Sequence, residues 1–309
     1  MDSDSSAKLA PAVLDRTVAR ESGGWALWAE LVKARLNSLV LLTTLVGFYL
    51  AHPGPVNWIG LAHVLIGVGL LAAGGGALNQ WMEREQDGLM PRTQHRPLPS
   101  GRIQPQTALL VGSGLAAAGL GYLVWATHPL AALLGGLTLA SYLLLYTPLK
   151  RKVWWNTWVG ALPGALPPVI GWAAAQGELA PGAWALFGIV ACWQMPHFFG
   201  IAWMYRQDYA RAGFCMLPQV DPTGARTARQ AVFWTLLLLP VSLGPWWADL
   251  TGPWYLAAAL GAGLAYSGTA VHFARSRSDR AARGLFLASI LYLPVLLVFL
   301  VLDKAGMRF

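Results

Sequence analysis

Asn79, Glu83 and Asp87 are three oxygen-bearing side chains at positions i, i+4 and i+8 of one segment. On a helix this spacing places them along a single face. Carboxylate and amide oxygens are ligands that Mg²⁺ accepts, and Mg²⁺ commonly shares its coordination sphere with substrate phosphates. The spacing therefore predicts a magnesium site. Spacing alone leaves open a second interpretation, a solvated helix end whose acids pair with nearby arginines.

Four basic side chains have the chemistry to bind phosphate beside this site. Arg92 and Arg96 repeat the i, i+4 spacing directly after the acids, and a guanidinium group can bind two phosphate oxygens at once. Lys150 and Arg151 follow a later apolar run and could add phosphate contacts, although cations in such a place can also serve only as a topology anchor. Acids and cations together predict a site for a metal-neutralised diphosphate.

A second polar loop, residues 205–230, contains Arg206 and Asp208. It follows the first polar loop, residues 79–105, by four apolar runs, so the two loops hold equivalent positions in two four-helix halves. In membrane proteins built from repeats, binding sites often lie between the halves. We expect the two loops to face each other across the mouth of a cavity.

His197 lies inside an apolar run, in the segment "CWQMPHFFGIAW". Ionisable groups within a membrane span are costly and usually face the bundle interior or an aqueous cavity. A histidine there could bind a metal or haem iron, or move a proton. The alternative is a structural histidine that only satisfies its neighbours.

These side chains are positioned by a chain of 309 residues that is 56% hydrophobic and only 12% charged. Soluble proteins carry about 25% charged residues, so the composition predicts a membrane protein. A membrane helix needs about 20 mostly apolar residues. The sequence predicts an all-α polytopic bundle of nine such helices, at residues 31–51, 57–78, 106–126, 129–147, 157–176, 182–204, 231–249, 253–273 and 284–302.

The basic residues predict how the bundle is oriented. Twenty of the 22 Lys and Arg residues fall in the amino-terminal segment and in the loops after every second span; Lys304 and Arg308 are the exceptions. By the positive-inside rule these segments are cytoplasmic, which places the amino terminus inside and the carboxyl terminus outside. The net charge of +8 is first a signal of topology, and no nucleic-acid partner is expected.

Residues 1–24 are predicted to be a retained, disordered cytoplasmic tail, followed by one transmembrane domain over residues 25–309. The tail mixes acidic and basic residues and lacks the basic start, apolar centre and cleavage site of a secretory signal. Its acids also argue against an organelle transit peptide. A bacterial inner membrane is the expected location, with the lipid bilayer as the first partner.

The segment "NQWMEREQDGLMPRTQHRPLPSG" resembles the signature of the haem branch of the UbiA-type intramembrane prenyltransferases, the protohaem IX farnesyltransferases. Four later segments are similar to that family's other conserved blocks and follow in the same order, so the resemblance covers roughly residues 30–302. These segments are "YTPLKR" (146–151), "GALPGALPPVIGW" (160–172), "PHFFGIAW" (196–203) and "DYARAGFCMLP" (208–218).

The resemblance implies nine helices around a central cavity and a reaction that joins haem B, farnesyl diphosphate and water to give haem O and diphosphate. It implies Mg²⁺ as the cofactor, and His197 is the residue it places on the haem side. A downstream haem A synthase or oxidase assembly factor is a further candidate partner. The implied magnesium ligands are Asn79, Glu83, Asp87 and Asp208, which are the expected catalytic residues together with His197, and the implied diphosphate-binding residues are Arg92, Arg96, Lys150, Arg151 and Arg206.

Two departures from the wider superfamily bear on the choice of substrate. Glu83 stands where many members have Asp, and Asp208 is followed four residues later by Ala212 rather than by a second Asp. The second departure fits the haem branch and argues against a phenolic or quinone-precursor acceptor, which is the alternative within the enzyme class. A carrier of an anionic lipid or haem is the alternative outside it, but a carrier needs no acidic face for Mg²⁺.

Overall fold

The computed structural model describes residues 24–52 and 54–305. Within them the chain is helical, and its β-pairing is a single bridge between Thr251 and Lys304, so the predicted all-α architecture is confirmed. Of the predicted tail only Gly24 is described, and α1 begins there. The elements are α1 (Gly24–Leu31), α2 (Ala34–Ala51), α3 (Trp58–Gly88), α4 (Pro105–Ala126), α5 (Pro129–Ala140), η1 (Ser141–Tyr146), α6 (Thr147–Leu149), α7 (Asn156–Ala165), α8 (Pro167–Gln176), α9 (Pro181–Met204), α10 (Arg206–Arg211), α11 (Leu217–Val220), α12 (Ala225–Val241), α13 (Gly244–Trp247), α14 (Pro253–Ser276) and α15 (Asp279–Leu302).

Eight helical segments of the described chain are long and apolar enough to cross a membrane. These eight helices confirm the predicted polytopic membrane architecture. The helices α4, α5, α9 and α14 begin with proline at the first helical position, where the missing N–H costs no hydrogen bond. The eight segments are residues 34–51, 58–88, 105–126, 129–149, 156–176, 181–204, 253–276 and 279–302.

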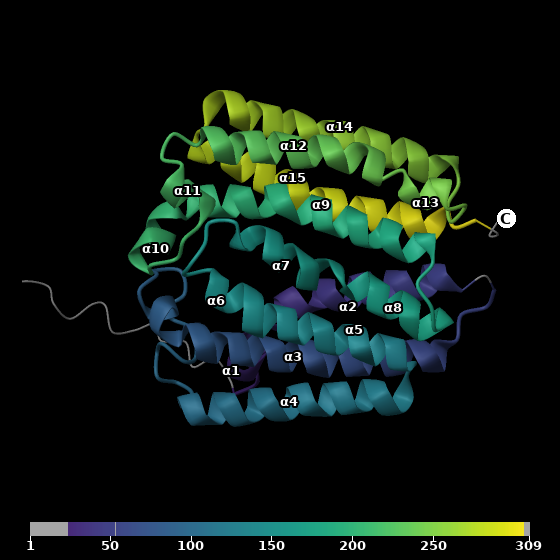
Figure 1. Ribbon diagram of the computed structural model, residues 1–309, viewed down its shortest axis with the longest axis horizontal. Helices are drawn as coiled ribbons and strands as arrows, with labels where there is room; N and C mark the ends of the chain where they lie inside the picture. Colours follow the sequence, from purple (N-terminus) through teal and green to yellow (C-terminus); the bar gives the residue numbers. More distant parts are fainter. Residues whose placement is uncertain (1–23, 53, 306–309) are drawn as a thin grey trace, which may run out of the picture.

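The predicted count of nine spans is not confirmed. The segment expected at residues 231–249 forms α12, which has 17 residues and is followed by the short helix α13. Pro240 lies in the last turn of α12, and proline both lacks an N–H and crowds the preceding turn. α12 nevertheless lies alongside α14 and runs in line with the other long helices (Figure 1).

The long helices lie side by side and share two ends (Figure 1). α3 packs along α4, α2 along α8, and α14 along α15. One end, at the left of the figure, carries α10, α11 and the carboxyl-terminal turn of α3; the other carries α13 and the end of the described chain. The predicted polar loops are therefore at the same end of the bundle.

Two breaks in the helices shape the interior. η1 is a π-helix between α5 and α6, a form with a wider turn that often marks functional sites. α7 ends at Ala165 and α8 begins with Pro167 and Pro168, which interrupt the hydrogen-bond ladder of a continuous helix. Gly164 sits at this break because a Cβ there would overlap Oε1 of Gln194.

The outer surface of the bundle exposes large apolar side chains, among them Leu110, Trp125, Leu133 and Leu264. Exposure on this scale is unfavourable in water but suits contact with lipid. Lys304, one of the two exceptions to the charge pattern, donates from Nζ to the backbone oxygens of Tyr49 (2.7 Å) and His52 (2.5 Å). It thus satisfies carbonyls at the carboxyl-terminal end of α2.

Candidate functional site

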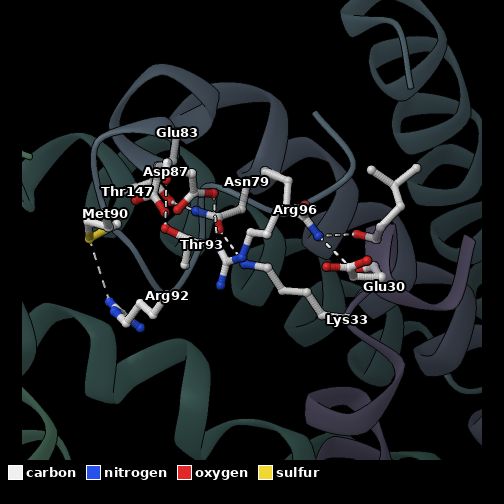
Figure 2. Close-up of polar contacts among 12 residues, drawn as sticks. Glu30, Lys33, Asn79, Glu83, Asp87, Met90, Arg92, Thr93, Arg96 and Thr147 are labelled. Carbon is white, nitrogen blue, oxygen red and sulfur yellow. Dashed lines mark hydrogen bonds and ion pairs between the residues drawn. The ribbon is translucent and has the colours of Figure 1, made fainter. Parts of the chain in front are cut away.

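Asn79, Glu83 and Asp87 lie on one face of α3, as their spacing predicts, because the helix continues without a break to Gly88. All three are buried, with 0%, 6% and 2% of their surfaces exposed. Figure 2 shows the three side chains next to one another. We call them the α3 polar face. Their burial rules out the solvated helix end that the spacing alone left open.

Both carboxylates of the α3 polar face form ion pairs. Nζ of Lys150 lies 2.9 Å from Oε1 and 3.2 Å from Oε2 of Glu83. Nη1 of Arg96 lies 2.7 Å from Oδ2 of Asp87. Buried carboxylates require such partners, since an unpaired buried charge is strongly unfavourable. The two acids thus pair with basic residues inside the protein, and not at a solvated helix end.

The loop after α3 folds back to bring Arg96 to Asp87. Thr93 is buried and donates from Oγ1 to the backbone oxygen of Asp87 at 2.8 Å. The backbone N–H of Arg96 in turn bonds to the Thr93 carbonyl at 2.9 Å. This tight turn places the guanidinium beside the carboxylate that precedes it by nine residues (Figure 2).

Asn79 is oriented by a hydroxyl on one side and a lysine on the other. Its Nδ2 donates to Oγ1 of Thr147 at 3.0 Å, and its Oδ1 accepts from Nζ of Lys33 at 2.5 Å. Thr147 follows η1 and itself donates to the carbonyl of Tyr142 at 2.8 Å. The amide oxygen therefore faces the basic side chains, which is the orientation a cation ligand requires.

Lys33 is the functional candidate that sequence reasoning missed. It lies between α1 and α2 with φ of 54°, in the left-handed region, and its Nζ also contacts the hydroxyl of Tyr142 at 3.3 Å. Burial, and next the positive charge of Arg96, lower the pKa of Lys33 to about 7. In the sequence Lys33 is one of the topology charges at the start of the first predicted span, residues 31–51, and nothing else there marks it.

Lys150 connects the α3 polar face to the second polar loop. Its Nζ lies 4.7 Å from the ring centre of Tyr146 and 5.9 Å from that of Phe214. Burial alone would lower the pKa of Lys150, but the attraction of the Glu83 carboxylate outweighs it and the pKa is raised. The ammonium group therefore remains charged throughout the physiological pH range.

The two polar loops touch each other through Arg92. Its guanidinium carbon lies 5.0 Å and 4.8 Å from the ring centres of Tyr205 and Tyr209, at distances typical of cation–π contacts. Behind it, Met90 of the first loop is buried in one cluster with Phe214 of the second loop. The structure thus brings together the loops that the sequence places four apolar runs apart.

Three other predicted site residues make different contacts. Asp208 forms an ion pair with Arg211 at 2.7 Å, and Arg206 pairs with Asp279 of α15 at 2.6 Å. Arg151 is exposed next to Lys150. Within the described residues, none of the hydrogen bonds or ion pairs of the α3 polar face involves these three side chains.

His197 lies in α9 among aromatic rings. Its ring centre is 5.3 Å from that of Trp193 and 5.0 Å from that of Phe286, and its Nδ1 lies 2.7 Å from Oγ of Ser289. The hydrogen bond and the two ring contacts determine the orientation of the imidazole. Sequence reasoning placed His197 toward the interior of the bundle, and the structure agrees.

A central cavity of about 250 Å³ connects these parts. Both Lys33 and His197 line it, together with Tyr142 and Tyr146 of η1 and apolar residues of α2, α3 and α9. It therefore extends from the lysine that contacts Asn79 to the histidine among the aromatic rings. Such a site can hold a long apolar molecule with a polar group at the basic end.

Comparison with known proteins assigns the family. Residues 40–294 match the UbiA prenyltransferase family. The chain belongs to the UbiA prenyltransferase family. A UbiA relative from Solibacter usitatus (strain Ellin6076), named Protoheme IX farnesyltransferase, is 47% identical over 289 residues, which cover 91% of this chain and 99% of that protein.

Solved structures share the UbiA fold. One, described under the biosynthesis of Digeranylgeranylglyceryl phosphate synthase in membranes, superposes with a TM-score of 0.76 at 16% identity, over 90% of this chain and 98% of that chain. A UbiA homolog from Archaeoglobus fulgidus, bound to DMAPP and Mg²⁺, has a TM-score of 0.63 at 16% identity, over 88% and 98%. Both likenesses extend over nearly the whole bundle.

Proposed function

We propose that the protein transfers the farnesyl group of farnesyl diphosphate to a vinyl group of haem B, with water, giving haem O and diphosphate. The observation that carries this proposal is the cavity that extends from Lys33, which bonds to Asn79 of the α3 polar face, to His197. The UbiA relative named Protoheme IX farnesyltransferase supports the choice of acceptor. In the reaction the carbon–oxygen bond to diphosphate breaks, the farnesyl carbon bonds to one vinyl carbon, and a water oxygen bonds to the other with release of a proton.

Mg²⁺ is the proposed cofactor at the α3 polar face, and the donor set fits it. Two carboxylates and one amide oxygen, those of Glu83, Asp87 and Asn79, lie together on this buried face. The remaining coordination positions would then be filled by diphosphate and water, which is how proteins usually bind Mg²⁺. The UbiA homolog bound to DMAPP, a prenyl diphosphate, and Mg²⁺ supports this choice.

The proposed roles at this end of the cavity follow from the contacts. Asn79, Glu83 and Asp87 would hold the metal, which when bound would supply positive charge to neutralise the diphosphate. Asp208 is proposed as a further ligand because its loop reaches the first loop through the Arg92 contacts. The proposed diphosphate-binding residues are Arg92 and Arg96 from the loop after α3 and Lys150 and Arg151 after α6, together with Arg206 at the start of α10.

The proposed diphosphate-binding Arg and Lys residues would act on the step in which the bond to diphosphate breaks and negative charge develops. The departing diphosphate carries about three negative charges, and positioned cations that stabilise developing charge often make the largest contribution to catalysis. The apolar and aromatic lining of the cavity keeps water from the allylic cation, and the faces of Tyr142 and Tyr146 can stabilise positive charge.

His197 is the proposed haem-side residue. Ser289 engages its Nδ1, so Nε2 is the nitrogen available to a ligand in the cavity. Trp193 and Phe286 pack against the imidazole and would extend an apolar surface beside a flat ring system. Haem B is the proposed acceptor at this end.

The proposed location is a bacterial inner membrane, with the amino terminus and the polar loops in the cytoplasm and the carboxyl terminus outside. The distribution of Lys and Arg supports this orientation. A haem A synthase or an oxidase assembly factor that receives the product is a proposed partner.

The direct test incubates membranes that contain the protein with haem B, farnesyl diphosphate and Mg²⁺. We expect a farnesylated, hydroxylated haem, detected by chromatography and mass spectrometry. Folded protein that yields no such product, or that prenylates a phenolic acid instead, would contradict the proposal. If the protein binds both substrates but forms no product, the result would favour the alternative that it is a carrier of an anionic lipid or haem.

A further inference from the structure

Each member of the α3 polar face is bonded to a different basic side chain. Lys33 contacts Asn79 and Arg96 contacts Asp87, and Lys150 contacts both oxygens of Glu83. The three basic residues come from separate parts of the chain, the α1–α2 junction and the segments after α3 and α6. We call Lys33, Lys150 and Arg96 the cation caps.

The cation caps leave the α3 polar face without excess negative charge. Glu83 and Asp87 supply two negative charges, and the caps supply at least as many positive ones. A divalent cation arriving alone would add two more positive charges to a buried cluster, where repulsion is weakly screened. A diphosphate arriving with the metal would instead bring an excess of negative charge. The electrostatics therefore favour joint binding over binding of the metal alone.

Geometry leads to the same conclusion at Glu83. Lys150 Nζ lies within 3.2 Å of both carboxylate oxygens, whereas Mg²⁺ binds oxygen at about 2.1 Å. An ammonium and a metal ion cannot both occupy that position without strong repulsion. A metal ion that binds between the two oxygens of Glu83 must therefore displace Lys150.

The caps are built to move. The side chains of Lys150 and Arg96 keep 17% and 28% of their surfaces exposed, against 8% and 3% for the acids they contact. A lysine has a flexible stem of four carbons, and Lys33 already lines the cavity where the substrate would lie. Each cap can therefore turn from the α3 polar face to a diphosphate oxygen by a side-chain movement.

We propose that the cation caps hold the α3 polar face in the free protein and transfer to the diphosphate when it arrives, so that metal and diphosphate bind as one unit. This inference rests on the proposed magnesium–diphosphate site. The caps prevent the acids from capturing a metal before the substrate is present. By thermodynamic linkage, the diphosphate strengthens metal binding by the same factor as the metal strengthens diphosphate binding.

The test compares two titrants on the full-length protein in lipid nanodiscs. Equilibrium dialysis measures binding of Mn²⁺ alone and of the preformed complex of Mn²⁺ with inorganic diphosphate. In Lys150→Met, Mn²⁺ alone should bind about tenfold more tightly, a typical size for such couplings, because Glu83 has lost its cap. The complex should bind about tenfold more weakly, because a phosphate contact has been lost.

Shifts of opposite sign separate this role from a structural one. A lysine that only supported the fold would weaken both titrants when replaced, and that result would overturn the proposal, as would an unchanged affinity for Mn²⁺ alone. Lys152→Met is the matched control because this exposed residue lies in the same loop, and it should shift neither titrant. If Lys150→Met does not fold, Arg96→Gln gives the same test at Asp87 with the same expected signs.

The outcome is distinguishable from failure of the proposed function. The titrations contain no haem. Shifts of opposite sign in a protein that makes no haem product would therefore support the exchange of the cation caps and contradict haem B as the acceptor. A protein that makes the haem product but shows parallel shifts would retain the function and reject the exchange of the caps.

Discussion

At the scale of single residues, the site is an arrangement of buried charges that compensate one another. Spacing in the sequence predicted that Asn79, Glu83 and Asp87 share a face, because helix periodicity determines which side chains lie together. Arg96 lies beyond the end of α3 and reaches Asp87 through the turn that follows the helix. Spacing did not predict Lys33, whose approach to Asn79 depends on how α1 and α2 pack against α3. Nor did it predict that Arg206 would pair with Asp279, since both contacts join residues far apart in the chain.

Asp87→Asn should abolish most activity while the fold is retained. The amide keeps the shape of the side chain and can still accept a hydrogen bond from Arg96, but it removes one of the two negative charges that Glu83 and Asp87 contribute to the site. We expect a loss of roughly 100-fold or more in haem O formation, as for other groups that stabilise developing charge. Product formation and the melting temperature should be measured together; full activity would contradict the metal assignment.

His197→Phe should separate the two ends of the cavity. Phenylalanine keeps the aromatic packing against Trp193 and Phe286 but removes both ring nitrogens. Haem binding, followed by absorbance, should weaken by about tenfold or more, the usual loss when a metal site loses a supporting group. Binding of Mn²⁺–diphosphate should be unchanged. Equal weakening of both ligands would argue against a haem-side role.

At the scale of elements, interruptions of the helices shape the cavity as much as the helices do. Apolar runs predicted most spans to within a few residues, because the bilayer sets the length that a helix needs. The π-helix η1 was not predicted, since its six residues are as apolar as a regular span. α12 fell short of the predicted span because its last turns contain Pro240 and the chain then turns into α13.

Gly164→Ala tests the break between α7 and α8. A methyl group there overlaps Oε1 of Gln194, so the amide must turn aside and give up the hydrogen bond that its Nε2 donates to the carbonyl of Ala161 at 3.0 Å. We expect a cost of about 0.5–1.5 kcal/mol, the usual contribution of one hydrogen bond, seen as a lower melting temperature. Gly114→Ala in α4 is the control, because nothing lies within 4 Å of its added methyl group. Equal melting temperatures would show that the break tolerates a side chain.

At the scale of the whole molecule, the basic residues concentrate at the end that carries the site. Segments at that end contain Arg92, Lys150 and Arg206, whereas Lys304 stands at the opposite end and binds carbonyls at the carboxyl-terminal end of α2. The asymmetry was readable from the sequence because insertion into a membrane responds to Lys and Arg near the ends of spans. The two equivalent polar loops and the family resemblance both predicted a cavity, but neither predicted its lining, which comes from helices that are distant in sequence.

Thiol labelling of intact cells should report the orientation. In a background with Cys192 and Cys215 replaced by Ser, Ser100→Cys should react with a membrane-impermeant reagent only after lysis, because its loop is predicted to be cytoplasmic. Glu178→Cys, in the segment between α8 and α9, should react without lysis. The reverse pattern would invert the topology and place the diphosphate end outside.

The π-helix η1 has a further consequence for chains that carry an insertion or deletion there. A π-helix differs from an α-helix by one extra residue in its turn, so removal of one residue from 141–146 would restore regular α-helical hydrogen bonding. Because the wider turn already takes up the extra residue, α5 and α6 would keep nearly their present register across the deletion. A chain that lacks one apolar, lipid-facing residue such as Leu144 should therefore keep the contact between Thr147 and Asn79. A second deletion, in what is then a regular helix, would rotate Thr147 away from Asn79 by about 100°, the angle that one residue subtends in an α-helix.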